Sequence, residues 1–249
     1  MAVDETAGTA GTGRRRSAPR GAAARVVVPD VRAWVRSTPG TRIWLLVLAA
    51  TSCVMAAAPP DLGSFLLHQN STNLAELGSR PVRALLGSAL WTESPAAFGL
   101  YALCFGAVHA PAERRLGTRR WLGVAALAHA GASVLSQQAV QQAVQQAVQL
   151  GIHASRLPAS LARTVDIGVS YGLAGVVGVP AHRVRPPWRL PYLLAAAGFL
   201  AYPLVTPGRT CTDLGHVIAL LIGLACRGLT PRGRAAPGPG RSRPRRWRP

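Results

Sequence analysis

Apolar segments nearly free of charge alternate along the chain with short polar connections. Most of them are shorter than the roughly 20 residues that cross a bilayer without tilt, which leaves open a soluble bundle of buried helices. Segments so poor in polar residues, however, offer too little polar surface to coat a soluble bundle. The pattern therefore predicts an all-α, polytopic membrane protein whose six spans lie at residues 43–58, 96–110, 121–136, 167–179, 190–205 and 214–226.

Polar tails flank this region. Residues 1–40 are rich in Ala, Gly, Thr and Arg, and residues 230–249 in Pro, Gly and Arg. Such compositions predict disordered basic tails around a membrane domain at residues 41–229. A leader of some forty residues exceeds the charged region of a secretory signal, so the first apolar segment is expected to remain as a span.

A tandem Gln-Gln-Ala-Val repeat occupies residues 137–149. Its period of four lies close to the 3.6 residues of a helical turn, so it could extend the third helix beyond the membrane. Three copies are too few and too short for a solenoid. The favoured interpretation is a repeat expansion within an outer loop.

The net charge of +19 by itself would suggest a nucleic-acid partner. All of the basic residues are arginine, and they gather in the two tails and in short connections. That distribution follows the positive-inside rule of membrane proteins, in which cytoplasmic loops are the more basic ones. It predicts a multi-pass plasma-membrane protein with both termini cytoplasmic, in contact with the lipid bilayer and not with nucleic acid.

A serine and a histidine carry the candidate chemistry. Ser170 stands near the start of the fourth apolar segment, in Gly-Val-Ser-Tyr-Gly, and His216 near the start of the sixth. With the termini inside, both segments enter from the outer face, which puts the two residues at one depth, within roughly 5 Å of the end of the apolar run. Ser and Gly also serve as helix-packing residues, and a lone histidine is often just a satisfied polar group. The joint occurrence favours a Ser-His dyad.

Two aspartates precede these residues. Asp166 lies one turn before Ser170, and Asp213 precedes His216. Each is a candidate for capping its helix or for orienting the dyad. The remaining histidines show no metal-binding spacing, and the four cysteines show no Cys-x-x-Cys spacing, so neither a metal nor a cofactor is expected.

Taken together, these motifs resemble the rhomboid intramembrane serine proteases, in particular their divergent bacterial rhomboid-like relatives. The resemblance covers roughly residues 43–229. Besides Gly168-Val169-Ser170 and His216, followed by Ala219 and Gly223, two further stretches carry it. Residues 81–91 are similar to the family's first-loop segment, and residues 113–117, Glu-Arg-Arg-Leu-Gly, to the motif that closes its second helix.

The resemblance implies a six-helix bundle that cleaves transmembrane substrates near the outer face. Its catalytic residues would be Ser170 and His216, with Gly168, Gly172 and Tyr101 as oxyanion or structural candidates. Two departures stand out. Tyr171 replaces the glycine that usually follows the serine, and Ala97 and Tyr101 stand where the family carries a histidine and an asparagine.

These departures keep a second interpretation open, a catalytically inactive rhomboid-like pseudoprotease that binds transmembrane helices. Under either interpretation the expected partners are single-span transmembrane proteins, as substrates or as clients. A transporter or channel would need charged or polar residues deep in the spans. Few occur there, mainly His129 and scattered serines, so this class is disfavoured.

Overall fold

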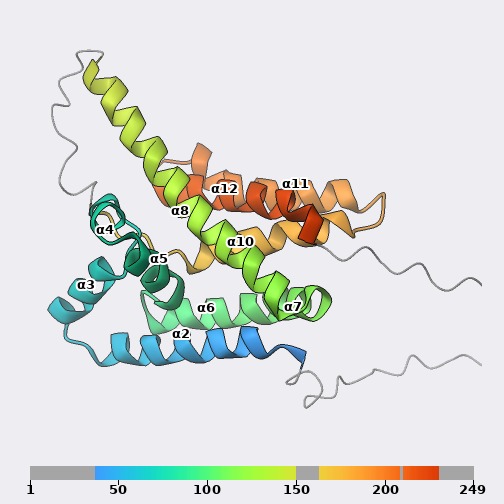
Figure 1. Cartoon of the computed structure of the whole chain (residues 1–249), viewed down its shortest axis with the longest axis horizontal. Coiled ribbons are helices and arrows are strands. Elements are labelled where there is room, and N and C mark those ends of the chain that lie inside the picture. The colour runs from blue at the N-terminus through green and yellow to red at the C-terminus, as the bar shows by residue number, and fades with distance from the viewer. Residues whose placement is uncertain (1–36, 150–162, 208–209, 230–249) are drawn as a thin grey trace, which may run out of the picture.

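The computed structural model describes residues 37–149, 163–207 and 210–229, and this part of the chain is helical, without strands (Figure 1). The first half holds α2 (Pro39–Ala57), α3 (Pro60–Gln69), α4 (Leu74–Ser79), α5 (Pro81–Leu90), α6 (Pro95–Cys104), the π-helical turn η1 (Phe105–His109) and α7 (Ala110–Leu116). The second half holds α8 (Thr118–Gln149), α10 (Val169–Gly178), α11 (Arg189–Ala201) and α12 (Cys211–Ala225). The 3-10 turns η2 (Val179–His182), η3 (Tyr202–Val205) and η4 (Cys226–Leu229) extend the last three helices.

The helices of membrane-spanning character coincide with the apolar segments of the sequence. In the described part, Pro39–Ala57, Pro95–Leu116 and Cys211–Leu229 are long and apolar enough to cross a membrane, and Arg189–Val205 is a shorter apolar helix. The second of these is continuous through α6, η1 and α7. The other two apolar segments lie in α8 and α10. The all-α fold expected from the sequence is confirmed.

The Gln-Gln-Ala-Val repeat is helical, as in one of the two interpretations that the sequence left open. It continues α8 as regular helix to Gln149, and in Figure 1 this end of α8 projects away from the other helices. Gln and Ala are good helix formers, and no Gly or Pro interrupts the helix between Ser133 and Gln149. The helix started by the apolar segment therefore has no reason to end where the polar repeat begins.

A buried glutamate fixes the start of α2 against the end of α7. The Glu113 carboxylate accepts hydrogen bonds from Gly40 N (2.8 Å), Thr41 N (2.8 Å), Thr41 Oγ1 (2.6 Å) and Thr118 Oγ1 (2.7 Å). These include N–H groups that the first turn of a helix leaves without an internal partner. Helix α7 ends at Leu116, and Gly117 follows it with a φ of 80°, a conformation that favours glycine.

Helices α8, α10 and α12 form the tightest part of the bundle. Gly175 on α10 faces Ala128 on α8 and Gly223 on α12 so closely that a Cβ at Gly175 or Gly223 would overlap its neighbour. Small residues let helix backbones approach in this way, which strengthens packing inside a membrane. Gly175 and Gly223 thus belong to a helix-packing face of small residues.

Helix α11 packs much more loosely. It has no buried residue, and the side chains of Leu190, Leu194 and Phe199 are 63%, 63% and 81% exposed. A hydrogen bond from Tyr192 Oη to the Val177 carbonyl (2.6 Å) links its first turn to α10. In Figure 1 α11 lies beside α12, on the far side of the bundle from α2 and α6.

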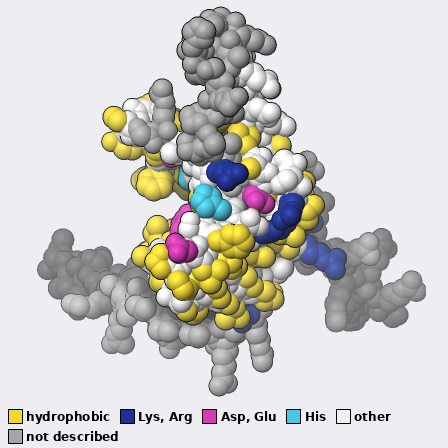
Figure 2. Space-filling view, turned by 90° about the vertical axis from the view of Figure 1, so that its left-hand side faces the viewer, with side chains coloured by type: hydrophobic (Ala, Val, Ile, Leu, Met, Phe, Trp, Pro, Cys, Tyr) yellow, Lys and Arg dark blue, Asp and Glu magenta, His cyan; other side chains and the backbone are white. Residues whose placement is uncertain are grey.

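The helices between α2 and α6 gather at one end of the bundle. Helices α3, α4 and α5 lie at the end where α6, α10 and α12 begin (Figure 1). Viewed from that side, charged and histidine side chains form a group amid hydrophobic surface (Figure 2). The starts of α10 and α12, and with them Ser170 and His216, therefore belong to the end that the charge distribution predicts to face outward.

Candidate active site

Ser170 is the second residue of α10. The helix begins at Val169 with Gly168 as its N-cap, two residues later than the sequence pattern suggested. Ser170 is partly exposed, between the buried Val169 and Tyr171. The first N–H groups of a helix have no partner four residues earlier. In α10 the N–H of Tyr171 donates to the Gly168 carbonyl (3.0 Å), so the N–H groups of Val169 and Ser170 are the candidate backbone donors beside the serine.

His216 is the sixth residue of α12, because that helix begins at Cys211, three residues before the apolar segment that we recognised. Thr210 and Asp213 explain the earlier start. Asp213 Oδ2 accepts hydrogen bonds from Thr210 N (2.7 Å) and Thr210 Oγ1 (3.0 Å), and these two residues form a capping box. Asp213 is thus a capping residue in this structure.

Ser170 and His216 line the same cavity, whose volume is about 890 Å³. Its walls come from the α6, α10, α11 and α12 helices and the residues beside them, and they are mostly apolar. The few polar groups that face it are Glu93, Tyr101, Ser170, Cys104, Tyr202, Thr212, Asp213 and His216. No hydrogen bond joins Ser170 to His216 in the described part of the chain, so the two are neighbours across a cavity.

Tyr101 supplies a further hydroxyl beside the serine. It lines the cavity from α6, and Ser170 lines the same cavity from α10. Ala97, one turn earlier, packs instead against the apolar core. Of the two positions that would carry the family's second-helix pair, Tyr101 alone offers a hydrogen-bond donor toward Ser170.

Glu93 lies at the mouth of this cavity, in the connection between α5 and α6. Its side chain keeps solvent-exposed surface. Partial desolvation and, to a smaller extent, the charge of Asp166 raise the pKa of Glu93 above its usual range. Two carboxyl groups, those of Glu93 and Asp213, line the cavity.

Asp166 holds the surroundings of the dyad together. Its carboxylate is buried and accepts hydrogen bonds from Tyr171 Oη (2.9 Å to each oxygen), Thr212 Oγ1 (3.0 Å) and Thr72 Oγ1 (3.1 Å). Its backbone N–H donates to Ser71 Oγ (2.7 Å). The aspartate does not cap α10, whose N-cap makes no side-chain hydrogen bond. It instead connects the residues before α4, the serine helix and the histidine helix.

Tyr171 bridges from this aspartate to the histidine. It is fully buried, and its ring meets the His216 ring edge to face, with centroids 5.3 Å apart and planes at 70°. Gly215 lies so close that a Cβ there would come within 2.6 Å of the Tyr171 hydroxyl. The residue that replaces the expected glycine after the serine therefore packs directly against His216.

The two flanking glycines have different surroundings. A Cβ at Gly168 would overlap the ring of His129, so close packing requires glycine there. Gly172 faces Trp44 and Ala125, at distances that leave room for a Cβ, and it does not line the cavity. Gly168 lies in the segment that leads into Ser170, whereas Gly172 belongs to the packing of α10 against α2 and α8.

The other candidate ligands stay apart. Within the described residues no group of three or more His, Cys, Asp or Glu side chains is arranged to hold a metal. Cys53, Cys104, Cys211 and Cys226 are free thiols. The chemistry available at the site is that of a hydroxyl, an imidazole and their hydrogen-bond donors.

Comparison with known proteins identifies one family. A family model described as rhomboid-like protein matches residues 33–236, which is most of the chain. The chain belongs to the rhomboid-like family. No curated protein and no solved structure matches it. Family membership, together with the apolar helices, makes this rhomboid-like protein a multi-pass membrane protein.

Sequence reasoning missed the tertiary partners of this rhomboid-like site. The Asp166 carboxylate accepts hydrogen bonds from Thr72, Thr212 and Tyr171, although Thr72 lies 94 residues away along the chain. His129 was noted only as a polar residue inside a span, yet it contacts Gly168. A histidine or aspartate in an apolar setting needs a polar partner. The sequence shows this requirement at both positions, but it does not show which residue is the partner.

Proposed function

We propose that this rhomboid-like protein is an intramembrane serine protease that uses Ser170 and His216 to cleave single-span transmembrane proteins. The observation that carries the proposal is the shared cavity, because it places a helix-terminal serine, a histidine and the Tyr101 hydroxyl around one space. Membership of the rhomboid-like family supports the same conclusion.

In the proposed reaction His216 accepts the proton of Ser170 Oγ as that oxygen attacks the substrate carbonyl carbon. The resulting oxyanion is stabilised by N–H groups at the start of α10 and by the Tyr101 hydroxyl. Collapse breaks the C–N bond, and His216 gives its proton to the leaving amine. Water then cleaves the acyl-enzyme ester in the same way and restores Ser170.

The missing Ser170–His216 hydrogen bond is compatible with this scheme, because catalytic hydrogen bonds are often long without substrate and shorten in the complex. Asp166, itself buried, holds Tyr171 against the His216 ring and holds Thr212 one turn before His216. We propose that Asp166 thereby orients the histidine through Tyr171 and Thr212.

Substrates would enter from the bilayer beside α11. Residues of α11, Ala196, Gly198 and Phe199 among them, line the cavity, and α11 has no buried residue. A loosely packed helix costs little to displace. A transmembrane helix could thus reach Ser170 sideways and unwind locally in the cavity. We place the cleavage near the outer face of the plasma membrane, with both termini cytoplasmic.

A second candidate function rests on a different observation. His216 contacts the Tyr171 ring and makes no hydrogen bond with Ser170, and Ala97 offers no donor where the family has one. A rhomboid-like protein with this geometry and no activity would still bind a transmembrane helix in the cavity. It would act on the fate of that client without cutting it.

A cleavage assay in proteoliposomes distinguishes the two candidate functions. The reporter is a single transmembrane helix with Gly and Pro in its outer half, placed between two soluble domains. The protease hypothesis predicts no cleavage by Ser170→Ala or His216→Ala. Wild type should cleave the reporter, and so should the control Ser133→Ala, which changes a buried serine of α8 outside the cavity. Cleavage that survives Ser170→Ala contradicts the protease hypothesis. Photocrosslinking of an uncut reporter to cavity residues favours the second hypothesis, in which the protein binds a transmembrane helix without cleaving it.

A further inference from the structure

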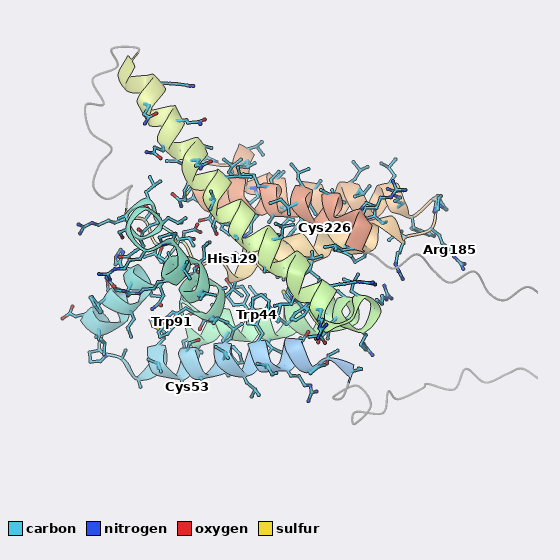
Figure 3. All side chains as sticks on the ribbon, viewed as in Figure 1. Trp44, Cys53, Trp91, His129, Arg185 and Cys226 are labelled. Carbon is cyan, nitrogen blue, oxygen red and sulfur yellow. The ribbon has the colours of Figure 1, made fainter. Side chains whose placement is uncertain are left out.

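A buried histidine bridges two segments on either side of the candidate active site. His129 on α8 is 5% exposed. Its Nδ1 lies 2.9 Å from the Gly168 carbonyl oxygen, and its Nε2 lies 2.9 Å from the Leu85 carbonyl oxygen and 3.3 Å from Ser88 Oγ. Figure 3 labels His129 where α8 passes α5. One imidazole thus contacts the first-loop helix α5 and the residue two positions before Ser170.

The fit around this ring is close. Gly168 lies against the ring without space for a Cβ, and the Gly168 carbonyl also accepts the hydrogen bond of Tyr171 N (3.0 Å) in the first turn of α10. The backbone that enters the serine helix is therefore fixed from outside by His129 and from within by the helix. A buried hydrogen-bonding group of this kind resists displacement, because losing one partner leaves the other unsatisfied.

Neighbouring contacts bind the same segment to the first loop. Asp166 N donates to Ser71 Oγ, and the Asp166 carbonyl accepts from Thr72 N (2.9 Å). Residues 163–168, which lead into α10, are not helical. Their geometry therefore depends on contacts from outside the segment, to which α8 contributes His129 and α12 contributes Thr212.

We infer that His129 is a positioning residue for Ser170, tying α5 to the backbone that carries the serine so that the two move as one unit. The inference rests on the proposed function, because Ser170 must be a nucleophile for its position to matter to rate. It assigns His129 no contact with substrate, since this residue does not line the cavity.

The test compares His129→Leu with His129→Gln in proteoliposomes. Leucine fills the space but donates nothing, whereas the glutamine amide carries two N–H groups that can serve the carbonyls. The readout is the rate constant for labelling by a fluorophosphonate, separated into probe affinity and the chemical step. We expect His129→Leu to slow the chemical step at least about tenfold with little change in affinity, and His129→Gln to recover most of the rate.

His109→Leu is the matched control. His109 is also fully buried, but its ring stacks on Phe105 and accepts a hydrogen bond from Trp121 Nε1 (3.1 Å), away from α5 and Gly168. The control should lower thermal stability yet leave the labelling rate of the folded fraction near wild type. An equal loss of rate in both leucine variants, or no loss in His129→Leu, overturns the inference.

Hydrogen exchange makes the result independent of activity. In His129→Leu, amides of α5 and of residues 163–171 should exchange at least about tenfold faster, while His129→Gln and His109→Leu stay near wild type there. Wild type that never labels contradicts the proposed protease, and the exchange pattern then decides on its own whether His129 holds these segments. Unchanged exchange in His129→Leu overturns the inference.

Discussion

The three helices α8, α10 and α12 and the single helix α11 pack in opposite ways. In the first group Gly175 and Gly223 meet with no space for a Cβ, and Ala128 and Ala219 are fully buried. Helix α11 buries no residue at all, and a Cβ at its Gly198 would meet nothing. Both regions are apolar, so hydrophobicity alone does not distinguish them.

The difference lies in what each region carries. Ser170 and His216 stand on two helices of the tight group, joined through Asp166. Helix α11 carries neither residue and contributes part of the cavity lining. In a membrane, apolar surface gains little by leaving lipid for protein, so close packing of small residues decides which helices hold together. Two candidate catalytic residues on closely packed helices, with a loosely packed helix beside them, suit the proposed chemistry, which needs both precise positioning and substrate entry.

The largest effect should come from filling the tight contact. Gly223→Leu forces a side chain into the Gly175 backbone and should cost about 3 kcal/mol of stability or more, with loss of the folded state in detergent. Gly198→Leu on α11 should cost less than about 0.5 kcal/mol. Thermal unfolding followed by circular dichroism measures both. Similar losses for the two leucines would contradict the contrast between the regions.

Removing the buried carboxylate should come next. Asp166→Ala leaves the hydroxyls of Tyr171, Thr212 and Thr72 without their acceptor, at an expected cost of about 3 kcal/mol. Asp61→Ala, an exposed aspartate at the start of α3, serves as the control and should stay within about 0.5 kcal/mol of wild type. Denaturation in mixed micelles compares them. A mild loss in Asp166→Ala would mean that the network does not hold the helices.

A smaller change isolates the tyrosine hydroxyl. Tyr171→Phe keeps the ring against His216 but loses the bonds to Asp166, so it should cost about 1 to 2 kcal/mol. Tyr192→Phe, which loses one hydrogen bond from α11 to the Val177 carbonyl, should cost about 1 kcal/mol or less. The two variants compare how much a tyrosine hydroxyl contributes to stability in the tight region and at α11. Chemical denaturation midpoints with unchanged slopes give the answer, and a larger loss for Tyr192→Phe would reverse the expected order.

A substitution in the loosely packed helix α11 should change function more than stability. Phe199 lines the cavity yet is 81% exposed, so Phe199→Ala should change stability by less than about 0.5 kcal/mol. It should alter cleavage of a transmembrane reporter severalfold while fluorophosphonate labelling, which needs no helix entry, stays near wild type. Leu190→Ala, exposed on the same helix but outside the cavity, is the control. Equal effects on reporter and probe would contradict lateral entry beside α11.

The smallest effect concerns charge at the cavity mouth. The pKa of Glu93 is raised by desolvation and by Asp166, so its ionisation opposes folding and stability declines as the pH rises through the unfolded and then the folded pKa. Glu93→Gln should therefore melt slightly higher than wild type at neutral pH, and the gain should vanish in acid, where Glu93 is protonated in both states. Melting curves from pH 3 to 8 check the trend. A gain that persists in acid would show that the charge is not its cause.

The sequence predicted what depends on local pattern. The helices followed from spacing and composition, and the family from the resemblance of several short motifs. The start of α12 at Cys211 was missed because Thr210 and Asp213 set it, while the apolar pattern begins only at Leu214. Of the two interpretations of the repeat, the structure shows the helical one, and Gln and Ala favour helix.

The unpredicted part of the candidate site consists of contacts between distant residues. Nothing local to Asp166 indicates Thr72 or Thr212, and nothing local to His129 indicates Gly168. Such pairings arise only when helices pack, and packing depends on the whole set of side chains at each crossing. The requirement that buried polar groups find partners was visible in the sequence, but the partners themselves were not.

The most direct test of the proposed dyad is labelling of the membrane-embedded protein with a fluorophosphonate, followed by mass spectrometry to locate the modified residue. The proposed mechanism predicts a covalent adduct on Ser170 that disappears in His216→Ala, while Ser133→Ala labels as wild type does. An adduct on another serine, or no adduct in folded protein under conditions that label an active rhomboid protease, would contradict the dyad.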